Sequence, residues 1–95
     1  MVAQGMKPVK KAVPAAGFVT VQLVTDEGTT DLHVPPSGRW STASSRHLSL
    51  GDYDRWAELV LSPEDFDAWL DLDPRIDDAQ KVLAEWTRQV RAGAS

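Results

Sequence analysis

Residues 18–34 decide the fold, and they read FVTVQLVTDEGTTDLHV. In both halves of this stretch, apolar residues alternate with polar ones. The alternating apolar residues are Val19, Val21, Leu23, Leu32 and Val34. This period of two is typical of strands with one buried face. Between the halves, Asp26-Glu27-Gly28 supplies a turn in which Gly28 can adopt a positive φ. The stretch therefore predicts a β-hairpin, which must pack against other elements because an isolated two-stranded hairpin is only marginally stable.

Further along, Leu61-Ser62-Pro63-Glu64-Asp65-Phe66 carries the clearest helix start in the chain. Ser62 is a typical N-cap, Pro63 suits the first helical position, and the acids that follow favour the helix dipole. Leu61 and Phe66 occupy the two positions of a hydrophobic staple. Similar signals predict three further helices: around 40–49, about 53–61 after an Asp52 N-cap, and from Asp73-Pro74 to about residue 92.

Each predicted helix has an apolar stripe at helical spacing. The stripes are Trp40, Ala43, His47 and Leu50; Tyr53, Trp56, Ala57 and Val60; Phe66, Trp69 and Leu70; and Ile76, Ala79, Leu83, Trp86 and Val90. The fold class expected is α+β, mainly α, with an N-terminal β-hairpin followed by a small bundle of three to four helices. We expect a flexible basic tail at 1–17, a single hairpin-plus-helices domain at 18–92 and a disordered end at 93–95.

Length and composition exclude several classes of function. The chain has 95 residues, a net charge of −4 and no cysteine. One small domain is expected at this length, and disulfides, thiolate nucleophiles and Cys-based metal sites are excluded. No apolar run approaches the roughly 20 residues that cross a bilayer, so no membrane span is expected. The acidic balance disfavours direct nucleic-acid binding, which relies on clustered positive charge.

No residue pattern predicts catalysis, a metal site or a cofactor. His33 and His47 lie in different predicted elements without ligand or catalytic spacing, and the serine-rich run 41–49 lacks a nucleophile motif. The aspartates between residues 71 and 78 lack the alternating ligands, the glycine and the closing glutamate of an EF-hand loop. We therefore expect a non-enzymatic protein with no catalytic residues, metal ligands or cofactors.

The segment 52–78 combines negative charge with aromatic residues. It holds ten acidic and two basic residues, for a net charge of −8. The chain's four tryptophans, one in each predicted helix, can form the core, or some can line a groove that accepts a partner helix. The two roles are compatible with each other. The candidate partner-binding residues are apolar side chains inside this acidic segment: Tyr53, Trp56, Phe66, Trp69 and Leu70.

Four stretches in a fixed order resemble the tail assembly chaperones of long-tailed actinobacteriophages. They are Pro35-Pro36-Ser37-Gly38-Arg39-Trp40, Gly51-Asp52-Tyr53-Asp54-Arg55-Trp56, a staple-capped helix from Leu61 to Trp69 followed by Asp71-Leu72-Asp73-Pro74, and Ala84-Glu85-Trp86. The resemblance spans roughly residues 17–88, although Ala79-Gln80-Lys81-Val82-Leu83 departs from the more aromatic, acidic stretch expected there. It implies a non-enzymatic factor in the cytoplasm of the bacterial host. Such a factor binds the helical tape-measure protein, or another helical phage protein, reversibly during tail assembly.

Two other classes of function stay open on the sequence. A structural subunit of a phage or phage-like particle would use the hairpin at 18–34 to join a neighbour's sheet. A small acidic regulatory or inhibitor protein would use the segment 52–78 as a decoy of DNA. Self-association of the chain is compatible with each class.

Deleting residues 1–16 is expected to leave thermal stability unchanged, because the apolar residues of this segment show no periodic pattern that would give a face for packing. Thermal unfolding of the full and shortened chains, followed by circular dichroism, measures the difference. A fall of several degrees in the shortened chain would instead show that the segment is docked on the domain.

Overall fold

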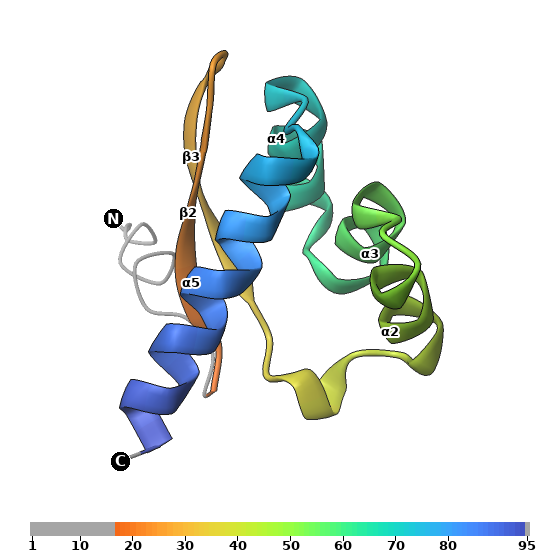
Figure 1. Ribbon diagram of the computed structural model, residues 1–95, viewed down its shortest axis with the longest axis vertical. Coiled ribbons are helices and arrows are strands. Elements are labelled where there is room, and N and C mark those ends of the chain that lie inside the picture. Colours follow the sequence, from red (N-terminus) through yellow and green to blue (C-terminus); the bar gives the residue numbers. More distant parts are fainter. Residues whose placement is uncertain (1–16, 95) are drawn as a thin grey trace, which may run out of the picture.

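The structure is a computed structural model, and it describes residues 17–94. The elements follow in the order β2 (Val19–Thr25), β3 (Gly28–Val34), η1 (Ser37–Arg39), α2 (Thr42–Ser49), α3 (Tyr53–Val60), α4 (Pro63–Leu72) and α5 (Ile76–Ala94) (Figure 1). An N-terminal hairpin followed by helices confirms the α+β, mainly α fold class. The tail predicted at 1–17 lies outside the described residues, except for Gly17.

The hairpin has the predicted buried face. Its strands pair antiparallel from Val19 opposite Val34 to Thr25 opposite Gly28, and Gly28 has a φ of 147°. Side chains of the inner face are fully buried, namely those of Val21, Leu23, Leu32 and Val34. The outer face carries polar residues and the exposed Val24. The two-residue alternation in the sequence thus becomes one apolar and one largely polar face.

Helices lie along both edges of this hairpin. In Figure 1, α5 runs beside β2, and α4 lies against β3. At the edge of β2, Gln89 Nε2 donates to the Thr20 carbonyl oxygen at 3.1 Å. At the edge of β3, the His33 backbone N–H donates to Asp65 Oδ2 at 2.8 Å. These side-chain bonds tie the hairpin to the helices and occupy backbone groups that a neighbouring strand would need.

The four tryptophans form one continuous row through the domain. Ring centroids are 5.0 Å apart for Trp86 and Trp40, 5.5 Å for Trp40 and Trp56, and 6.1 Å for Trp56 and Trp69. Such separations are typical of attractive aromatic pairs. Trp56 and Trp69 belong to the buried core together with the inner face of the hairpin, while Trp40 and Trp86 are partly buried at its side. The row therefore links α3, α4 and α5 with the loop before α2.

The predicted start of the last helix is wrong. Asp73 is the C-cap of α4 in the left-handed conformation, with φ 44° and ψ 62°, and the proline that follows cannot continue that helix. Helix α5 begins only at Ile76. The Arg75 carbonyl accepts from the Ala79 N–H at 3.0 Å, and the Arg75 N–H donates to Asp78 Oδ2 at 3.0 Å. Arg75 thus holds the cap position, with Asp78 reaching back as in a capping box.

The other helix ends differ by a few residues from prediction. Trp40 precedes α2, which begins at Thr42, and α5 continues to Ala94, into the end predicted to be disordered. Four residues assigned to apolar stripes are exposed, namely Leu50 at 75%, Ile76 at 64%, Leu70 at 49% and Val90 at 38%. Each lies at or near an end of its helix, beyond the reach of the core.

Gly51→Ala is expected to destabilise the domain by about 1–2 kcal/mol, the cost of the left-handed conformation for a residue with a Cβ. Gly51 has a φ of +80°, and a Cβ there would meet nothing within 4 Å, so the backbone alone sets this cost. Gly38→Ala is the matched control, because its added Cβ also meets nothing within 4 Å and its backbone lies outside the left-handed region. Urea unfolding measures both variants, and equal stabilities would contradict the expectation.

Candidate functional site

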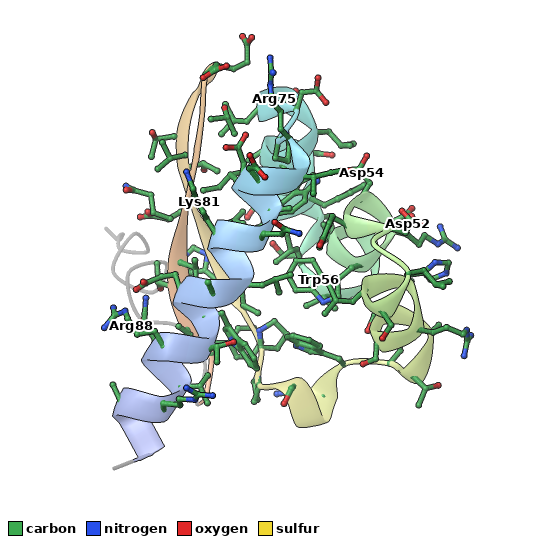
Figure 2. All side chains as sticks on the ribbon, in the orientation of Figure 1. Asp52, Asp54, Trp56, Arg75, Lys81 and Arg88 are labelled. Atoms are coloured by element: carbon green, nitrogen blue, oxygen red, sulfur yellow. The ribbon has the colours of Figure 1, made fainter. Side chains whose placement is uncertain are left out.

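The five candidate partner-binding residues do not form one surface. Trp56 and Trp69 are at most 1% exposed and belong to the core, so these two indoles are structural. In Figure 2, Trp56 lies between α3 and α5. Tyr53 and Phe66 are half-buried against the core, and Leu70 is 49% exposed on α4. A partner can therefore reach Tyr53, Phe66 and Leu70 but not the two indoles.

Asp54 fixes the orientation of Trp69. Trp69 Nε1 donates to Asp54 Oδ1 at 2.8 Å, which joins α4 to the first turn of α3. Because the acceptor is a carboxylate, this bond is stronger than one between neutral groups. The same carboxylate lies at the surface and adds negative charge where α3 begins.

A shallow groove opens where the start of α3 meets the start of α5. Its cavity has a volume of about 190 Å³ and an apolar lining of Tyr53, Pro74, Ile76 and Ala79. Ala79 is buried, whereas Ile76 is largely exposed. Gln80 Nε2 donates to the Tyr53 hydroxyl at 3.3 Å, which ties the two helices together beside the groove. We call this the α3–α5 groove.

The rim of the α3–α5 groove is mainly acidic. Asp52 and Asp54 belong to the N-cap and first turn of α3, and Arg75 lies just before α5 (Figure 2). Asp52 Oδ1 accepts from the Arg55 N–H at 3.3 Å, and its Oδ2 lies 3.4 Å from His47 Nδ1. The Arg75 guanidinium is 3.7 Å from Asp26 at the hairpin turn, so an acid outside the groove partly offsets the cation of the rim.

A second groove, between the outer face of the hairpin and α5, is polar. It includes Thr20, Gln22, Lys81, Glu85 and Arg88, and Figure 2 shows Lys81 and Arg88 on the side of α5 near β2. Arg88 Nε donates to Glu85 Oε1 at 2.9 Å. This bond, helped by a second from Gln89, lowers the pKa of Glu85 to about 2, and the same pairing raises the pKa of Arg88.

The lowered pKa gives the Glu85–Arg88 pair a defined pH dependence. Its contribution to stability is complete above about pH 4.5 and is lost as the pH falls toward 2, since the carboxylate then takes up a proton. At neutral pH these two charges compensate each other. Among the described residues, the lining of the α3–α5 groove holds two aspartates, Asp52 and Asp54, and one cation, Arg75. This excess of negative charge makes that groove the better candidate for a positively charged partner.

The histidines make contacts between elements. His33 Nδ1 lies 3.2 Å from Asp65 Oδ2, and His47 Nδ1 lies beside Asp52. Within residues 17–94, no group of three His, Asp or Glu side chains is arranged to hold a metal ion. In the same part of the chain, no helix has the length and apolar character needed to cross a membrane.

Ile76 is the site residue that sequence reasoning misplaced. The stripe pattern assigned it to the core because it lies three residues before Ala79. The position of Ile76 directly after Asp73-Pro74-Arg75 could have indicated its exposure. The helix begins only at Ile76, and the first residue of a helix can lie outside the packed stripe.

Comparisons with family models, with curated proteins and with solved structures found no match to this chain.

Trp69→Ala is expected to lose about 3–5 kcal/mol of unfolding free energy, because it empties a core position and deprives Asp54 of its donor. Its neighbour Leu70 is half-exposed, so Leu70→Ala is expected to change stability by no more than about 0.5 kcal/mol. Urea unfolding of both variants measures the contrast. Similar losses at the two positions would contradict the division into a core residue and a surface residue.

Proposed function

We propose that this protein is a non-enzymatic assembly chaperone that binds a helical partner reversibly. The observation that carries the proposal is the presence of exposed aliphatic side chains within and beside a strongly acidic surface. Leu59, Leu70 and Ile76 are each at least 40% exposed, and all lie within the segment 52–78 that has a net charge of −8. Apolar patches rimmed by polar residues are typical of sites that bind other proteins, and these side chains would supply the apolar contacts of such a site.

The chemistry of this surface suits reversible binding. Apolar contacts supply affinity, while charges around them mainly set the encounter rate and the salt dependence. The exposed aliphatic groups lie on α3, α4 and the first residue of α5, so apolar contacts are available on three helices. The negative charge also disfavours contact between chaperone molecules, which keeps a complex with several copies soluble.

The client that fits best is the tape-measure protein of a phage tail. This choice rests on the resemblance of the ordered stretches between residues 17 and 88 to tail assembly chaperones. A long helical protein exposes apolar stripes and tends to self-associate before the tail tube encloses it. A small acidic protein with exposed aliphatic groups can cover such stripes until assembly, in the cytoplasm of the bacterial host.

The geometry of the hairpin disfavours a role as a structural subunit that adds strands to a neighbour. Such a role needs a free backbone edge. Here the Thr20 carbonyl on β2 accepts from Gln89, and the His33 N–H on β3 donates to Asp65. A neighbouring strand that paired along the whole of either edge would have to break one of these bonds.

Co-expression tests the proposed function. A tape-measure protein of a long-tailed actinobacteriophage is produced alone and together with the full chain, and the soluble fraction of the tape-measure protein is measured after centrifugation. We expect it to aggregate alone and to remain soluble with the chain, since its apolar stripes are then covered. Equal solubility in the two cultures would contradict the proposal.

Purified tail particles provide the second arm of this experiment. A chaperone leaves during assembly, so the chain should be absent from finished particles by quantitative mass spectrometry. A fixed, symmetric number of copies per particle would identify a structural subunit instead.

A further inference from the structure

We infer that the α3–α5 groove is the docking site for a helical segment that carries one bulky apolar side chain flanked by lysine or arginine. The inference rests on the proposed function and adds the surface and the chemistry of the partner. It depends on two features of the groove, its apolar lining and its acidic rim, and both are built where α3 and α5 begin.

The groove as a whole has the size of one large side chain. Its volume of about 190 Å³ compares with the roughly 150 Å³ of a protein cavity that can hold benzene. Ala79 is buried among the lining residues, whereas Ile76 is 64% exposed beside it. A leucine or phenylalanine of a partner placed there covers the Ile76 side chain and removes apolar surface from water.

The charges at the rim select a basic partner. Asp52 and Asp54 line the groove, and the exposed Asp77 directly follows Ile76. The only cation in the lining among the described residues is Arg75, which lies near Asp26. The ends of α3 and α5 at this place are N-termini with partial positive charge, but acidic residues in both first turns offset it. Lysine or arginine beside the apolar side chain therefore finds carboxylates within reach, whereas an acidic segment is repelled.

The exposed Ile76 has a role in binding rather than in folding. It occupies the first position of α5, ahead of Ala79 and Val82, which are the buried residues of that helix. Arg75 and Asp78 form the helix start through their backbone and carboxylate bond, without any contribution from the Ile76 side chain. Replacing this side chain can therefore alter docking while the fold stays intact.

Binding of a defined peptide tests the inference directly. The probe is a fluorescently labelled amphipathic helical peptide of leucine and lysine, titrated into the full chain and followed by fluorescence anisotropy. A peptide of the same pattern with glutamate in place of lysine is the charge control. We expect the lysine peptide to bind and the glutamate peptide to bind at least about tenfold more weakly. Equal binding of the two peptides would overturn the charge selection.

Two pairs of matched variants locate the site. Ile76→Ser is expected to weaken the lysine peptide about tenfold, whereas Val24→Ser, at a comparably exposed position on the outer face of the hairpin, stays within about twofold. Asp52→Asn keeps a competent N-cap on α3 but removes its charge, so it should weaken binding and reduce the salt dependence. Asp67→Asn on α4 removes the same charge outside the groove. Equal effects within either pair would overturn the assignment of the site, and unchanged urea unfolding confirms that the variants are folded.

A competition arm tests the alternative occupant, a second copy of this chain. Residues 1–16 contain Lys7, Lys10 and Lys11, so a synthetic peptide of this segment is added as a competitor. If the 1–16 peptide displaces the probe from the unaltered chain but not from Ile76→Ser, the groove serves self-association. That result would overturn the inference. Failure of this peptide to compete supports a separate partner.

The co-expression assay separates the inference from the proposed function. A client that becomes insoluble with Ile76→Ser but stays soluble with Val24→Ser supports both. A client that stays soluble with both variants leaves the chaperone function standing and overturns the groove as its docking site. A client that the unaltered chain fails to keep soluble removes the proposed function, while the peptide titrations still decide whether the groove binds a basic helix.

Discussion

Burial of the inner face of the hairpin against Trp56 and Trp69 is the contact on which the rest of the structure depends. A two-stranded hairpin has too little apolar surface to be stable alone. Its inner residues share one core with the two indoles and with Ala79 and Val82 of α5. The helices are short, apart from α5, and gain most of their stability from this packing rather than from propensity. The hairpin and the helices therefore stabilise each other, and neither part is expected to persist without the other.

This use of tryptophan shapes the binding surface. Because the four indoles pack against one another in a row, the domain buries its two most central rings completely. The apolar groups left at the surface are mainly aliphatic, and they lie near helix ends, as Leu50 and Ile76 do. A surface of this kind offers several small contacts instead of one aromatic anchor. That arrangement suits a partner that must be released later, because no single contact has to be broken at high cost.

The acidic residues serve the fold and the surface at the same time. Asp52 caps α3, Asp65 binds a backbone N–H at the edge of β3, and Asp54 orients Trp69. Each of these carboxylates has a local partner, so the high negative charge of the segment 52–78 does not prevent packing. The remaining acids, which include Asp67 and Asp77, are exposed to solvent. Asp77 adds charge beside the α3–α5 groove, whereas Asp67 adds charge on α4 outside that groove.

Local chemistry determined much of this protein from sequence alone. The alternation in residues 18–34, the Ser62-Pro63 helix start and the Asp52 cap each act over a few residues, so their patterns predicted the hairpin, α4 and the start of α3. The tertiary structure decided which apolar residues reach the core. Trp56 and Trp69 were open to either role, since helical spacing defines a stripe but not what covers it. The stripe pattern predicted a buried Ile76. Because Asp73 is left-handed and Arg75 caps α5, the helix begins at Ile76, whose side chain is exposed. The α3–α5 groove is likewise a product of packing, because its walls come from helix starts more than twenty residues apart in the chain.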